Sequence, residues 1–155
     1  LENLGFSVKI IFLMRDPIER MWSAIRMVKR DYKKFSEIAD NDLILQRYKL
    51  PQVEARSRYD LTMQNVEKVF AVSDIFYCLY EDLFCPESIN RLQDFLGLND
   101  NKFNFNDTIN ISPKEQVLDA MIQREIANYY RNVYDFVGER FSIEDRWTSV
   151  IHLSN

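Results

Sequence analysis

A short apolar run that ends in an arginine and leads directly into a helix start constrains this chain more than any other feature. Residues 9–23 read KIIFLMRDPIERMWS, and residues 10–14 are apolar on both faces, as is typical of a central strand in a covered parallel sheet. Asp16 can cap the following helix, and Pro17 fits its first position because the N–H that proline lacks would be unpaired there. Arg15 is therefore expected at the carboxyl end of a strand and beside a helix N-terminus, where α/β proteins bind phosphate.

The helix that follows, expected from Ile18 to about Arg30, carries a serine away from its packing face. Its apolar residues repeat at the i, i+3, i+4 and i+7 spacing. Ser23 lies five residues after Ile18, so at about 100° per residue it points about 140° away from that stripe. The spacing allows Arg15 and Ser23 to hold one phosphate. It equally allows a salt-bridged arginine and an ordinary helix serine.

Three blocks of the sequence resemble the sulfotransferases that use 3′-phosphoadenosine 5′-phosphosulfate (PAPS). FLMRDPIERMWS at residues 12–23 is similar to the family's 3′-phosphate-binding motif, whose arginine and serine match Arg15 and Ser23. Residues 57–70 resemble the family's tyrosine-bearing helix. Residues 75–98 resemble its strand ending in Tyr-Glu-Asp-Leu and the helix ending in Phe-Leu-Gly-Leu, and the order and spacing of all three blocks agree.

The resemblance implies an α/β, P-loop NTPase-like sulfotransferase fold, of which this chain is the helix-rich C-terminal portion with a small parallel sheet. It implies PAPS as co-substrate, no metal, and transfer of a sulfuryl group to a hydroxyl or amine of a small-molecule or glycan acceptor. Tyr59 matches a tyrosine that lies near the adenine in the family, and plain core packing is the alternative for it. Such chemistry depends mainly on positioning and on stabilising charge at the leaving phosphate.

The family's P-loop-like segment has no counterpart in this sequence. The three glycines, Gly5, Gly97 and Gly138, are isolated, and the family's catalytic lysine and base precede the 3′-phosphate motif. Residues 1–155 are therefore expected to form one incomplete domain whose catalytic residues are unknown and which does not turn over PAPS by itself. A strand at residues 9–14 without its neighbour is expected to pair with another copy, giving a homo-oligomer. A non-catalytic sulfotransferase-like binding module and part of a P-loop kinase remain the alternatives.

The composition indicates which classes of partner and which cellular compartment are expected. The net charge of −4 argues against broad nucleic-acid binding, although a nucleotide needs only a local positive site. No apolar run approaches the roughly 20 residues of a membrane span, and no signal peptide is recognised. Cys78 and Cys85 are expected to be free thiols, which favours a cytoplasmic location.

The other residues with reactive or charged side chains give weaker indications of function. Glu81 and Asp82 follow a strand and point opposite ways, so we expect a structural role rather than an acid–base pair. His152 is near the end of the chain, a poor place for a catalytic base. The basic and aromatic segment at residues 31–58 would suit a sugar or acidic acceptor, but a solvated helical face has the same composition.

The remaining elements follow from periodicity and from start and stop signals. Ser57 is expected to cap a helix that runs to about residue 71, and Gly97 to end the helix that Pro86 begins. Further elements are expected as a strand at residues 75–80, a marginal helix at residues 35–48, a loop at residues 102–111 and a long helix at residues 112–138.

Overall fold

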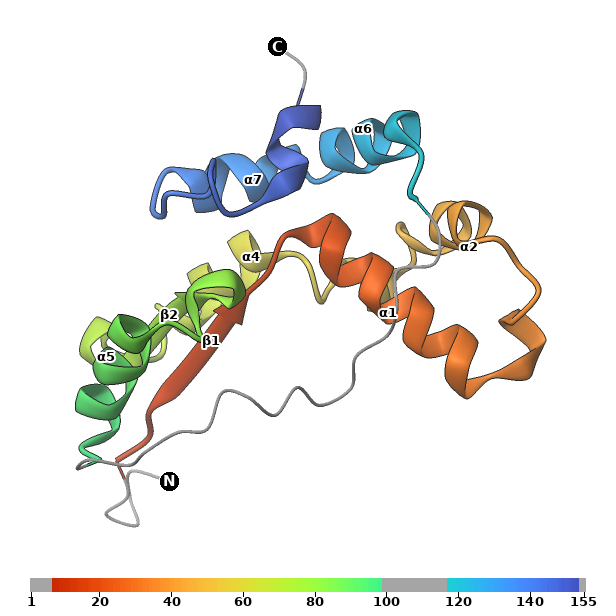
Figure 1. Cartoon of the computed structure of the whole chain (residues 1–155). Coiled ribbons are helices and arrows are strands. Elements are labelled where there is room, and N and C mark those ends of the chain that lie inside the picture. The colour runs from red at the N-terminus through yellow and green to blue at the C-terminus, as the bar shows by residue number, and fades with distance from the viewer. Residues whose placement is uncertain (1–6, 99–116, 154–155) are drawn as a thin grey trace. The chain divides into compact units, whose positions relative to one another are not determined.

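A computed structural model describes residues 7–98 and 117–153, and its architecture is α/β and rich in helices (Figure 1). The chain divides into two compact units, which are described in turn. The first comprises Leu1–Arg15 and Thr62–Ile109, and the second comprises Asp16–Leu61 and Asn110–Asn155. Within the described residues, no helix combines the length and the apolar character needed to cross a membrane.

The first unit is built on two parallel strands, β1 (Ile10–Met14) and β2 (Ile75–Leu79), which lie side by side in Figure 1. Their register pairs Ile10 with Ile75 and Met14 with Leu79. The expected small parallel sheet and both of its strands are thereby confirmed. The assignment to the sulfotransferase fold stays a prediction.

One face of β1 is open in the described residues. Met14 is fully buried, but Ile11 and Leu13 are 44% and 41% exposed. Among the described residues β1 has one neighbouring strand, β2, and the exposure of Ile11 and Leu13 agrees with the expectation that this strand lies partly uncovered without its other neighbour. Self-association through β1 stays a prediction.

Helix α5 (Pro86–Leu96) packs along β2, with the rings of Phe95 and Phe76 5.6 Å apart. As expected, Pro86 begins it and Gly97 ends it in the left-handed conformation, with φ 67°. Short 3₁₀ turns precede and follow β2 at Val72–Asp74 and Tyr80–Asp82. Both cysteines are free thiols, as expected.

The second unit begins with α1 (Pro17–Asp31), whose expected apolar stripe is confirmed because Ile18, Met21 and Ile25 are at most 4% exposed. The segment expected as one marginal helix is instead broken into short pieces. Beyond this segment, Pro51 begins a further short helix, since proline suits a first helical position. These elements are a 3₁₀ turn at Lys33–Phe35, α2 (Asp40–Arg47) and α3 (Pro51–Glu54).

Helix α4 (Tyr59–Val66) is shorter than the sequence indicates, and the boundary between the two units falls within it. Ser57 does not cap it, because the Ser57 hydroxyl accepts hydrogen bonds from Arg20, 37 residues earlier. Competition from a distant partner therefore overrode the local capping pattern.

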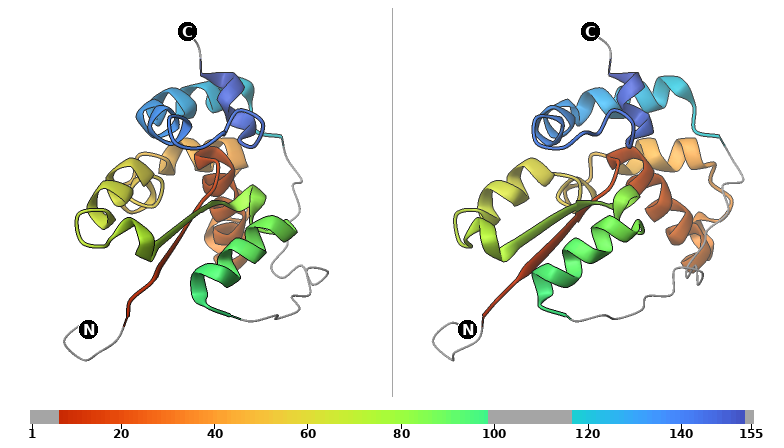
Figure 2. Two further views of the ribbon diagram at one scale, coloured as in Figure 1. Left: turned by 90° about the vertical axis from the view of Figure 1, so that its left-hand side faces the viewer. Right: turned by 60° about the vertical axis from the view of Figure 1, so that its left-hand side comes forward.

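The segment expected as one long C-terminal helix forms two helices, α6 (Ala120–Tyr129) and α7 (Arg131–Gly138). A 3₁₀ helix follows at Thr148–His152. Figure 2 shows the 3₁₀ helix lying against α6. The loop at residues 102–111 and the helix start at residues 112–115 lie outside the described residues. Val117 and Met121, expected in the apolar stripe, are 86% and 81% exposed. Val117 precedes the helix, which begins only at Ala120 and is capped by the Asp119 carboxylate, and Met121 lies in the first turn of that helix.

Gly97 offers a test of the local backbone rule. We expect Gly97→Ala to lower the free energy of unfolding by about 1 kcal/mol, because a Cβ disfavours the left-handed region. No atom lies within 4 Å of the added Cβ, so the cost is conformational rather than steric. Gly97→Asn should lose less, because asparagine tolerates this conformation. Urea denaturation of the three proteins measures this, and equal loss in both variants would contradict it.

Candidate functional site

Arg15 follows β1 directly, and Tyr80 follows β2 directly. Since Met14 and Leu79 are register partners, both residues leave the same edge of the parallel pair. The Arg15 guanidinium lies over the Tyr80 ring, 5.0 Å from its centroid. The structure thus brings together the arginine of the 12–23 block and the tyrosine of the Tyr-Glu-Asp-Leu block. Sequence reasoning placed the arginine but missed this partner.

The carboxylates that follow Tyr80 belong to a 3₁₀ turn rather than to a strand end. Strand β2 stops at Leu79, and Glu81 and Asp82 continue the turn, with Glu81 exposed and Asp82 half-buried. Backbone N–H groups of Leu83 and Cys85 close the turn onto the carbonyls of Tyr80 and Asp82.

The expected cap of α1 is confirmed, but the capping carboxylate does more than cap. Asp16 is 1% exposed, and its Oδ1 accepts from the Ile18 N–H at 2.9 Å. The same oxygen accepts from the Tyr134 hydroxyl at 3.0 Å, and Oδ2 accepts from the Ser149 N–H at 2.9 Å. Burial, followed by the charge of Asp16, raises the pKa of Tyr134 well above its ordinary value. Tyr134 therefore stays protonated and remains a donor.

Ser23 lies on α1, half-buried and off the apolar stripe, as the spacing predicts. In residues 7–98 and 117–153, no hydrogen bond from its hydroxyl to the protein is seen. Arg15 belongs to the first unit and Ser23 to the second. Their joint binding of one phosphate stays a prediction.

Tyr59 is part of the core of the second unit. Its side chain is 4% exposed, and its ring centroid lies 6.2 Å from that of Trp147. Trp147 packs in turn edge-on against Tyr134, at 5.6 Å. Tyr59 therefore packs in the core, as the alternative for this residue expected. A contact of Tyr59 with adenine stays a prediction.

Arg20 is a half-buried cation that sequence reasoning missed. Its Nε and Nη2 donate to the Ser57 hydroxyl at 3.0 and 2.7 Å, and Nη2 also donates to the Val53 carbonyl at 3.1 Å. Burial lowers the pKa of Arg20. The signal in the sequence was slight, because a polar residue two positions after Ile18 on a helix is expected to face water.

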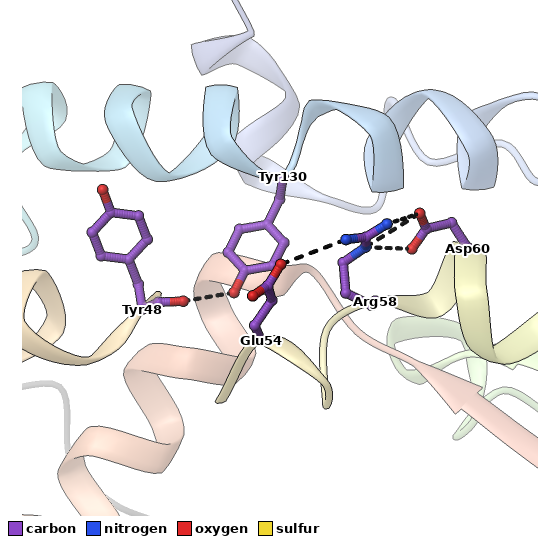
Figure 3. Close-up of polar contacts among 5 residues, drawn as sticks. All are labelled: Tyr48, Glu54, Arg58, Asp60 and Tyr130. Carbon is purple, nitrogen blue, oxygen red and sulfur yellow. Dashed lines mark hydrogen bonds and ion pairs between the residues drawn. The ribbon is translucent and has the colours of Figure 1, made fainter. Parts of the chain in front are cut away.

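A second polar cluster holds the segment between α2 and α4 (Figure 3). Arg58 binds the Asp60 carboxylate through Nε at 2.9 Å and Nη2 at 2.7 Å, and reaches Glu54 through Nη1 at 3.5 Å. Beside it, the Tyr130 hydroxyl donates to the Tyr48 carbonyl at 2.7 Å. Burial raises the pKa of Tyr130. Arg58 pairs with its two carboxylates, and Tyr130 bonds the Tyr48 backbone, so these contacts indicate a structural role.

Comparison with known proteins adds no relative. The chain matches no protein-family model, no curated protein and no solved structure. Among the described residues, no group of three or more metal-ligating side chains is found. The interpretation of the site therefore depends on the geometry above and on the resemblance of the sequence blocks.

Removing the Tyr134 hydroxyl tests the Asp16 cluster. Tyr134→Phe should lower the free energy of unfolding by about 1.5–3 kcal/mol, the range for a hydrogen bond to a charged group, because one donor to a buried carboxylate is lost. Urea denaturation measures this. Tyr129→Phe, at a ring 41% exposed, is the matched control and should change little. A loss no larger than that of the control would show that Asp16 does not depend on Tyr134.

The Asp60–Arg58 pair predicts an acid-dependent loss of stability. Burial alone would raise the pKa of Asp60, but the hydrogen bonds and charge of Arg58 outweigh it and lower the pKa below its ordinary 3.8. The stabilisation is therefore complete above the unfolded pKa and is lost as pH falls through the folded one. We expect the free energy of unfolding to decrease below about pH 4, and less steeply in Asp60→Asn. The exposed Asp135, changed to asparagine, should leave the slope unaltered.

Proposed function

We propose that this chain supplies the 3′-phosphate and adenine side of a nucleotide site in PAPS-dependent sulfuryl transfer to a hydroxyl or amine. The observation that carries the proposal is the contact between Arg15 and Tyr80 at the carboxyl edge of two parallel strands. Such edges are where open α/β sheets bind their ligands. The contact also joins two sequence blocks that each resemble the sulfotransferases.

Arg15 suits a phosphate chemically. A guanidinium stacked on a ring can still donate hydrogen bonds in its own plane, in the fork that fits phosphate oxygens. The stacking fixes the guanidinium before the ligand arrives, which lowers the entropy cost of binding.

The proposed role is binding and orientation. In the reaction, the bond from sulfur to the 5′-phosphate oxygen breaks, the acceptor oxygen or nitrogen bonds to sulfur and loses its proton, and 3′,5′-bisphosphoadenosine leaves. Holding the far phosphate sets the position of the reacting sulfur for in-line transfer. Arg15 and Ser23 would do this without touching the atoms that react.

A nucleotide titration tests the proposal. The chain should bind 3′,5′-bisphosphoadenosine more tightly than 5′-AMP in calorimetry, because only the former carries the 3′-phosphate. Arg15→Ala should abolish the preference, since a charge-assisted bond worth about 1.5–3 kcal/mol is removed. Ser23→Ala should reduce the preference less, because a neutral hydroxyl donates a weaker bond.

Arg91→Ala is the matched control, because Arg91 is an exposed arginine of the same unit whose guanidinium also lies over a ring, that of Phe76, at 5.5 Å. It should keep the preference. Equal affinity of the unaltered chain for both nucleotides would overturn the assignment of Arg15.

A further inference from the structure

A cavity of about 150 Å³ lies within the second unit, between α1, α2 and α3. Its walls are mainly apolar and include the buried side chains of Met21, Ile25 and Ile44. The polar side chains on it are Arg47, Gln52 and Arg56, together with Tyr48. No carboxylate lines it. The cavity thus combines an apolar interior with positive charge at its polar part.

The two arginines have no acidic partner in the described part of the chain. Arg47 is half-buried and faces the Phe35 ring at 5.5 Å, which holds the cation without neutralising it. Arg56 is exposed, and no ion pair is seen for it among residues 7–98 and 117–153. The net charge of the whole chain is −4, so two cations on one cavity with no ion pair among the described residues are a local exception.

A third cation lies behind the cavity wall. Val53 lines the cavity, and its carbonyl accepts from the half-buried Arg20, which also donates to the neutral Ser57 hydroxyl. Burial, and to a smaller extent the charge of Arg56, lowers the pKa of Arg20. The nearby carboxylates of Glu54 and Asp60 both bind Arg58 instead. The positive charge around α3 is therefore only partly compensated within the described residues.

We propose that this cavity binds a small aromatic carboxylate, with one ring in the apolar interior and the carboxylate at Arg47 and Arg56. The volume supports the ring, because a cavity of about 150 Å³ lined by aliphatic side chains accommodates benzene. The charge supports the carboxylate, because guanidinium groups pair with it in two-pronged geometry. The inference does not depend on the nucleotide site, since no residue of the first unit takes part.

Benzoate is the probe, and benzamide, with the same ring and no charge, is its neutral match. In ¹⁵N–¹H spectra of the full chain, benzoate should give saturable shifts at Ala24, Val28 and Val53. Benzamide should bind at least about tenfold more weakly than benzoate. Arg47→Gln and Arg56→Gln should each weaken benzoate about tenfold. Arg124→Gln, at an exposed arginine of α6 away from the cavity, should leave it unchanged.

A filling variant tests the location separately. Ala24→Leu places extra carbon in the cavity and should abolish benzoate binding, with circular dichroism confirming that the helices remain. Absence of saturable shifts at millimolar benzoate, equal affinity for benzamide, or unaltered affinity in both arginine variants would each overturn the proposal. Arg15→Ala should leave benzoate binding intact, so failure here and failure of the nucleotide proposal are distinguishable.

Discussion

The Asp16 carboxylate is the interaction on which the second unit depends. A carboxylate with 1% exposure costs several kcal/mol to bury unless its oxygens are satisfied. Here one donor is local, and the other two come from residues 118 and 133 positions further along the chain. The C-terminal segment is thus required at the start of α1, because its departure would leave an uncompensated buried charge. A single acidic side chain thereby makes the beginning and the end of this unit cooperative.

Side chains of helix α1 also fix the positions of other segments of the second unit. One turn after the cap, Arg20 fastens the segment before α4 through Ser57. Further along, Trp22 and Lys29 both bind the Asp40 carboxylate, at 3.1 and 2.8 Å, and so fix the start of α2. Part of the cavity wall is formed by the same helix. A shift of α1 would therefore disturb the contacts at Asp16, Ser57 and Asp40 together.

Local signals were enough to predict some elements. Pro17 with Asp16, and Pro86 with Gly97, are start and stop signals that act within a few residues, and the helices between them follow the sequence pattern. The pattern failed where a distant group intervened. Ser57 has the form of a cap, but Arg20 takes its hydroxyl. The break at Tyr130 coincides with a hydroxyl that reaches the Tyr48 carbonyl, 82 residues away. The periodicity of a single segment gives no information about hydrogen-bond partners that lie so far away in the sequence.

The arginines show why the candidate site was only partly predictable. From sequence, Arg15, Arg47 and Arg58 are alike, since each is a cation near an aromatic residue. The structure separates them by partner. Arg58 forms ion pairs with two carboxylates and so stabilises the fold. Arg15 and Arg47 lie over aromatic rings. A ring orients a guanidinium, and an oriented cation suits an anionic ligand. The chemistry of the partner, rather than the arginine itself, therefore distinguishes a structural cation from a candidate binding residue.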